Sequence, residues 1–221
     1  MEEWNSAVAG GEEKRIALGF DPESTSIRFL IDITLFTSVI REYYNAVTLK
    51  KRKLQVHKIL SLPHWHEHYK DKKTGRRVVS ELSRIEHEHE RQTAICLAQM
   101  NYDIVFAPSA MFQRGAKKFD IYILRDSIIL EADLKCISSR SPLTIAYRVR
   151  EGSEQASRVV VPITSDLDSK IQIQGLRSAS FNNSLLKEIL LIYKRKVYRL
   201  PKTLVMSDRI FDIIKNEKGY T

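Results

Sequence analysis

Two apolar segments separated by a short polar turn constrain the fold of this 221-residue chain more than any other feature. Residues 119–124 and 128–137 are rich in isoleucine, leucine and other large apolar side chains, and residues 125–127 between them have the composition of a turn. Short apolar runs bounded by turn residues are typical of paired β-strands. The sequence therefore predicts a β-hairpin in the second half of the chain.

Charged residues alternate with apolar residues along the second of these segments. Since successive side chains of a strand point to opposite faces, Glu131, Asp133 and Lys135 should project from one face. Ala132 and Leu134 should project from the other face, which suits a core. A row of two carboxylates and an ammonium on such an apolar strand is unfavourable unless the charges meet each other, a cation or a phosphate.

The hairpin can also bring Asp120, near the start of the first segment, beside this charged face. Carboxylates that converge repel one another and raise one pKa, unless a divalent cation neutralises them. Oxygen ligands favour magnesium or manganese, and such a cation activates water and stabilises charge on a phosphoryl oxygen. Asp120, Asp133 and Lys135 are therefore candidate catalytic residues, with both aspartates as metal ligands. The alternative is a solvent-exposed strand face with cross-strand ion pairs.

The other segments predict an α/β protein. Apolar residues at helical spacing indicate helices over 24–56 and 79–101, whereas the turn signals in 58–80 indicate a joint between two parts. We expect a helical N-terminal segment, 1–78, followed by an α/β domain, 79–221, in which helices pack on a sheet. The remaining predicted elements are strands over 102–107, 188–192 and 196–200 and helices over 153–161 and 166–173.

The charge of the chain favours a polyanionic partner. Lys and Arg outnumber Asp and Glu by 36 to 27, which gives a formal net charge of +9 and suits nucleic acid better than a membrane surface. A basic protein without such a partner is the alternative. The longest apolar segment, 27–47, is interrupted by charges and cannot span a bilayer, and the N-terminus lacks the pattern of a signal peptide. We therefore expect a cytoplasmic site of action.

The spacing from Asp120 to Asp133-Leu134-Lys135 resembles the active-site signature of the PD-(D/E)xK nuclease superfamily, although Phe119 and not proline precedes Asp120. The flanking residues resemble the C-terminal tRNase domains of CdiA-type contact-dependent growth inhibition toxins. This likeness extends over about residues 80–205. The segments that carry it are 99–108, 118–120, 132–135 and 150–156.

The resemblance implies a restriction-endonuclease-like fold, which is a three-layer α/β core with a mixed β-sheet. It also implies a divalent metal, Mg²⁺ or Mn²⁺, and cleavage of RNA with tRNA as the favoured substrate. If the chain is a toxin, the resemblance further implies a cognate immunity protein that neutralises it.

Further site residues follow from the same resemblance. In such domains the first helix supplies another acid, for which Glu86, Glu88 and Glu90 compete; Glu90 is our first candidate and Glu86 the second. The alternative is that all three simply solvate the helix surface. Gln155 matches a polar residue near the metal on the next helix, and Arg158 one turn later is placed to meet a phosphate. The other candidates for contact with nucleic acid are Lys118, Arg148 and Arg150.

Two other functions remain open at this level. The same fold and metal chemistry serve DNA endonucleases of mobile elements and repair systems, because substrate choice depends on shape and surface contacts. A non-catalytic nucleic-acid-binding protein is the other alternative, in which the charged strand is only structural.

Overall fold

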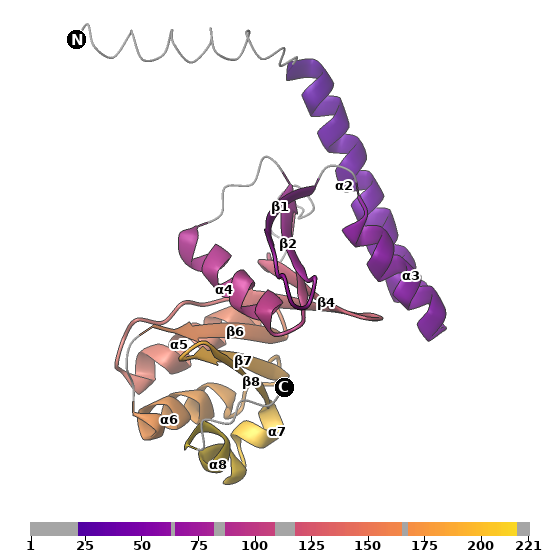
Figure 1. Ribbon diagram of the computed structural model, residues 1–221. Coiled ribbons are helices and arrows are strands. Elements are labelled where there is room, and N and C mark those ends of the chain that lie inside the picture. The colour runs from indigo at the N-terminus through magenta and orange to yellow at the C-terminus, as the bar shows by residue number, and fades with distance from the viewer. Residues whose placement is uncertain (1–21, 63–64, 82–86, 109–117, 165–167, 216–221) are drawn as a thin grey trace, which may run out of the picture.

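The structure is a computed structural model that describes residues 22–62, 65–81, 87–108, 118–164 and 168–215 (Figure 1). Its described strands form one eight-stranded mixed sheet in which the spatial order of the strands is their order in the chain. The β2–β3, β5–β6 and β6–β7 pairs are parallel and the other pairs are antiparallel. The strands are β1 (Trp65–Lys70), β2 (Arg77–Glu81), β3 (Asp103–Phe106), β4 (Ile121–Arg125), β5 (Ile128–Leu134), β6 (Arg158–Ile163), β7 (Glu188–Tyr193) and β8 (Lys196–Pro201).

Helices cover both faces of this sheet. On one face, α4 (Glu88–Gln99) packs over a buried cluster that includes Ile123, Ala132 and Leu134. The opposite face carries two further clusters, one under α2 and α3 and one under the C-terminal helices. The expected α/β fold with a mixed sheet and a helical N-terminal segment is confirmed. The helices of this second face are α2 (Pro22–Asn45), α3 (Leu49–Leu60), α5 (Pro142–Gln155), α6 (Ser169–Ser180), α7 (Lys202–Val205) and α8 (Arg209–Lys215).

The segment predicted as a joint, 58–80, contains a hairpin of the sheet. Strands β1 and β2 pair with each other, and β2 continues the sheet by pairing with β3. The predicted boundary at residue 78 therefore falls inside β2. Val78 and Val79 are both buried, because β2 has a covered face on each side. The division of the chain into domains stays a prediction.

The N-terminal helix is two helices and not one. Helix α2 ends at Asn45 and α3 begins at Leu49, where the Thr48 side chain accepts a hydrogen bond from the Lys51 N–H. Such an N-cap satisfies one of the unpaired N–H groups of a helix start. The predicted helix over 79–101 is also shorter, since residues 79–81 belong to β2 and α4 begins at Glu88.

The predicted helix over 153–161 is wrong in its position. Helix α5 begins after Ser141, with Pro142 in its first turn, and it ends at Gln155. Proline is favoured in the first turn because the N–H that it lacks would have no partner within the helix at that position. Its fixed φ angle also matches that of a helix. Residues 158–163 form β6, which lies between two parallel neighbours. The valines of β6 are buried on both faces of the sheet, as is usual for such a strand. Likewise, the helix predicted over 166–173 is α6, which continues to Ser180.

Two adjacent tyrosines attach α2 to β5. The Ile129 N–H donates to the Tyr43 hydroxyl oxygen at 2.9 Å, and the Tyr44 hydroxyl donates to Glu131 Oε1 at 2.7 Å. Tyr43 also packs in the buried cluster that contains Phe36 and Tyr122. The N-terminal helix α2 is thus fixed to β5, the strand that carries Asp133. No helix in the described part of the chain has the length and apolarity needed to cross a membrane.

Candidate active site

The β4–β5 hairpin places Asp120 opposite Asp133. The antiparallel register ends with the pair Ile121–Ala132, and Asp120 and Asp133 are the residues that follow it on the two segments. The Asp120 N–H donates to the Ala132 carbonyl oxygen at 3.2 Å, and the two aspartate side chains lie close enough to interact. The Asp120 carboxylate is held in place because its Oδ2 accepts the Leu134 N–H at 2.7 Å. The structure therefore brings together the two aspartates expected from the sequence.

Asp133 is a buried carboxylate with too few partners. Its exposed fraction is 1%, and its neighbours raise its pKa from 3.8 to about 7. Burial is the largest cause and the charge of Asp120 is the second, while the ion pair with Lys135 acts in the opposite direction. Lys135 Nζ lies 2.9 Å from Asp133 Oδ2, and among the described residues this buried oxygen has no further partner of regular hydrogen-bond geometry. The site is therefore short of positive charge when both aspartates are ionised.

Lys135 remains a cation at neutral pH. Burial alone would lower the pKa of its ammonium, but the hydrogen bond and charge of Asp133, with the charges of Glu151 and Asp120, raise it above the usual value. A lysine with a raised pKa cannot act as a general base near neutral pH. It can hold a phosphate oxygen or orient a water molecule as a hydrogen-bond donor.

Gly152 allows α5 to lie directly against Asp133. A Cβ atom added at this position would lie 2.9 Å from Asp133 Oδ2 and 2.8 Å from Val159 Cγ1. Both distances are shorter than real Cβ contacts, so any side chain here would displace Asp133 or Val159. We did not expect Gly152 to have a role, although a glycine inside a helix is a sequence signal of close packing.

Gln155 connects α5 with the segment that leads to Asp120. Its side-chain Oε1 accepts the Lys118 N–H at 3.0 Å, two residues before Asp120. Gln155 therefore lies close to the candidate site, and its recorded bond is to the backbone. Residue Lys118, also a candidate, is exposed.

Glu131 projects from the same face but has a different environment. It accepts the Tyr44 hydroxyl at 2.7 Å, and burial together with Glu131 raises the pKa of Tyr44 above its usual value. Of the three charged residues that alternate along this segment, Asp133 and Lys135 form an ion pair with each other, whereas Glu131 is hydrogen-bonded to α2.

The candidate acids of the first helix are not joined to this group. Glu90 lies on α4, which packs on the face opposite to Asp133, and Glu86 lies outside the described residues. In the described ranges no set of three or more His, Cys, Asp and Glu side chains is arranged to hold a metal ion. Glu151 of α5, which sequence reasoning did not single out, is the further acid that acts on Lys135.

The candidate phosphate contacts are in different places from those expected. Arg158 is the first residue of β6 and not part of a helix, and its Nε lies 3.4 Å from Glu188 Oε2. Arg148 and Arg150 are exposed on α5. The first pairs with Glu151 at 3.0 Å, and the second donates to the Ser178 carbonyl oxygen of α6.

The donor set fits a hard divalent cation. Mg²⁺ is commonly bound by one or two carboxylates and keeps several water molecules, so Asp120 and Asp133 suffice as protein ligands. The buried Oδ2 of Asp133, without a well-aligned hydrogen bond, is an oxygen that a cation would satisfy. A cation there would also favour the ionised form of Asp133.

Comparison of the chain with models of protein families, with curated proteins and with solved structures found no match. The assignment of function therefore depends on the geometry of the hairpin and on the resemblance of its motifs.

Asp133 should make the stability of the fold depend on pH. Its folded pKa of about 7 exceeds the unfolded value of 3.8, so the folded chain binds an extra proton between these pH values. The stability contribution is therefore full at low pH and is lost as the pH rises toward 7, by on the order of a few kcal/mol. We expect the unfolding temperature of Asp133→Asn to rise relative to the parent between pH 5 and pH 8.

Millimolar Mg²⁺ or Mn²⁺ should stabilise the parent, because a ligand that binds only the folded state raises its stability. We expect a larger stabilisation at pH 8 than at pH 5. The Asp133→Asn variant should not be stabilised by the metal at either pH. Thermal unfolding with and without metal measures both effects. Equal pH profiles for parent and variant would show that Asp133 does not have this raised pKa.

Proposed function

We propose that this protein is a metal-dependent endoribonuclease that cleaves the phosphodiester backbone of RNA, with tRNA as the favoured substrate. The observation that carries the proposal is the pairing of Asp120 with a buried Asp133, whose pKa is raised to about 7, beside the ammonium of Lys135 at 2.9 Å. A buried acid pair with a raised pKa, in contact with a cationic donor, is typical of a catalytic site.

Each side chain has a separate task in this proposal. Asp120 and Asp133 would hold the divalent cation, which when bound would activate a water and stabilise charge on the phosphoryl oxygen. Lys135 donates hydrogen bonds to the scissile phosphate or to the attacking water, and its positive charge favours the transition state. Gln155 and Gly152 position these groups, the first through the segment before Asp120 and the second by giving Asp133 room.

The preference for RNA is supported by the motif resemblance, while the net charge of +9 supports binding of nucleic acid in general. The charge favours capture of any nucleic acid, so it supports binding without distinguishing RNA from DNA. Action in the cytoplasm and neutralisation by an immunity protein belong to the same proposal, since both follow from the resemblance to the toxin domains.

The test is to incubate the purified chain with tRNA, plasmid DNA and single-stranded DNA, in Mg²⁺ or Mn²⁺. We expect cleavage of tRNA that stops in excess chelator and resumes when metal is added in excess of the chelator. Cleavage of DNA alone would instead assign the chain to the DNA endonucleases. Salt-sensitive binding of RNA without cleavage in either metal would contradict the proposal and favour a non-catalytic binding protein.

A further inference from the structure

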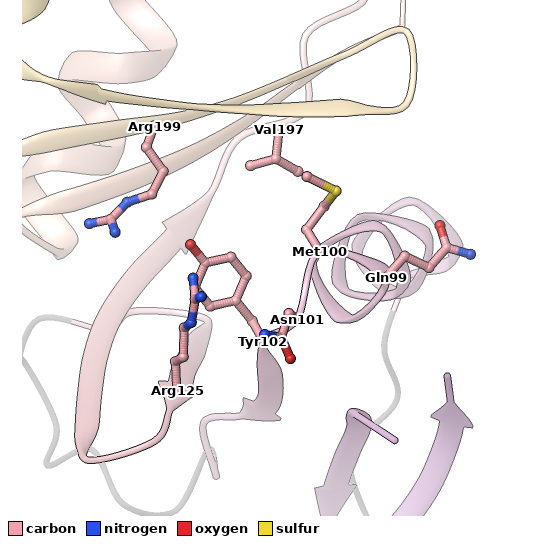
Figure 2. A pocket seen from close by; sticks show the side chains of 7 residues that line it. All are labelled: Gln99, Met100, Asn101, Tyr102, Arg125, Val197 and Arg199. Carbon is pink, nitrogen blue, oxygen red and sulfur yellow. The ribbon is translucent and has the colours of Figure 1, made fainter. Parts of the chain in front are cut away.

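A pocket of about 200 Å³ lies outside the candidate active site (Figure 2). Its walls come from residues 99–102, which comprise the last residue of α4 and the three that follow it, from Arg125 at the end of β4, and from Val197 and Arg199 of β8. Tyr102 and Val197 belong to the apolar cluster under α4, whereas Asp133 projects from the other face of the sheet. The pocket is therefore separate from the acid pair.

The pocket combines two guanidinium groups with a phenol. Arg125 lies over the Tyr102 ring, with its Cζ 5.5 Å from the ring centroid, and the Tyr102 side chain also interacts with Arg199. Figure 2 shows the Arg125 side chain lying against the Tyr102 ring, with Arg199 on the side of the pocket nearer the Tyr102 hydroxyl. Three polar side chains, from the residue before β3 and from β4 and β8, thus line one small space.

Positive charge exceeds negative charge around this space. Arg199 donates to Glu188 Oε1 from Nε at 3.0 Å and from Nη2 at 2.8 Å, and Arg158 lies 3.4 Å from Oε2 of the same carboxylate. The single buried carboxylate of Glu188 is therefore shared by two guanidinium groups. Arg125 adds a third positive charge, and in the described part of the chain no ion pair is recorded for it.

The acids nearest in sequence do not remove this excess. Asp103 and Asp126 both contact Arg76, at 2.8 and 3.7 Å, and so belong to a different ion-pair network. The pocket thus has the electrostatic character of an anion site, with charged donors and no acidic wall.

The size of the pocket fits one group of a ligand. Pockets for drug-sized ligands measure roughly 300–1,000 Å³, so 200 Å³ suits a single phosphate group better than an entire nucleotide. Guanidinium groups bind phosphate oxygens with two parallel hydrogen bonds, and they are the preferred side chains for this recognition.

We propose that the pocket formed by Tyr102, Arg125 and Arg199 binds a phosphate group, either in the backbone of an RNA strand or on a free nucleotide. The proposal does not require that the chain cleaves RNA. Arg125 is the residue to change, because Arg199 is also needed by the buried Glu188.

Binding of tRNA to the full-length chain is measured by filter binding over a range of salt concentrations, in excess chelator so that no cleavage occurs. Arg125→Gln should weaken binding about tenfold and reduce the salt slope by about one. Arg125→Lys should have a smaller effect, because it keeps the charge and loses the planar donor pair. The matched control is Arg209→Gln, an exposed arginine of α8 outside the pocket.

A second arm measures binding of inorganic phosphate and of AMP by calorimetry. Loss of this binding in Arg125→Gln, with tRNA affinity unchanged, would support the pocket and assign it to a free phosphate ligand. If Arg125→Gln equals Arg209→Gln in both arms, while both variants unfold at the parental temperature, the proposal is overturned.

Discussion

Replacing Asp133 with asparagine should abolish cleavage of tRNA while the folded chain becomes no less stable. The amide has the size of the carboxylate but lacks the charge that would hold the metal, so we expect a loss on the order of 10²- to 10⁴-fold in rate. At pH 8 the variant should unfold at the same or a higher temperature, because it removes a buried carboxylate whose pKa is raised to about 7. Single-turnover cleavage and thermal unfolding provide the two measurements.

The matched control is Asp126→Asn, which makes the same chemical change at the turn of the same hairpin. Asp126 is exposed and has a positive φ of 53°, a conformation that asparagine also accepts. This variant should cleave as the parent does. Cleavage by Asp133→Asn at the parental rate would refute the assignment of Asp133 as a metal ligand.

Lys135→Met extends this test to the ammonium. We expect a loss on the order of 10²- to 10³-fold, because a donor to the developing charge is removed. When both residues are changed, the double variant should lose little more than Asp133→Asn alone, since groups that act as a unit are not additive.

Gly152→Ala should inactivate the protein through displacement of a neighbour. Alanine normally stabilises a helix by about 1 kcal/mol relative to glycine, but here its Cβ would lie 2.9 Å from Asp133 Oδ2 and 2.8 Å from Val159 Cγ1. We expect destabilisation of about 1–3 kcal/mol and a rate loss of about 10²-fold, because small shifts of reacting groups have large effects. Chemical denaturation and cleavage at a temperature well below the transition give the two values.

Gly175→Ala separates the two effects. Its Cβ would meet Ile145 Cβ at 2.7 Å and the Pro142 carbonyl oxygen at 2.9 Å, an equally tight contact between α5 and α6 without contact to Asp133. This variant should lose stability by a similar amount and keep its rate. If both glycine variants lose activity equally, the effect of Gly152→Ala comes from unfolding and not from the site.

The site could be predicted from sequence where it depends on local pattern. Alternation along residues 128–135 predicts which side chains share a face, and the hairpin predicts that Asp120 comes near them. The register itself could not be predicted, because the expected turn spans residues 125–127 whereas Arg125 pairs with Ile128 in the structure. The β7–β8 hairpin was likewise predicted from local pattern, although its turn has Lys194 and Arg195 at positive φ, where glycine or asparagine is more usual.

What depends on packing between distant segments could not be predicted. The position of α5 was wrong because the apolar run of β6 is buried on both faces and shows no alternation, which cannot be distinguished from a helix by periodicity. The approach of Glu151 and Gly152 to the acid pair depends on how closely α5 packs on β5 and β6. Similarly, the pairing of β2 with β3 joins residues about 25 positions apart in sequence, and no local signal indicates it.

The Tyr43 contact to β5 determines how short a working version of this protein can be. A chain starting at residue 79 would lack the acceptor of the buried Ile129 amide and the side chains that cover Val105 and Tyr122. It would also lose β1 and the first two residues of β2, including Val78, which pairs with Ile104. Part of β3 would then become an open edge prone to aggregation. Expression of the smallest soluble unit must therefore begin upstream of Tyr43, so α2 serves as scaffold for the acid-bearing strand whatever else it does.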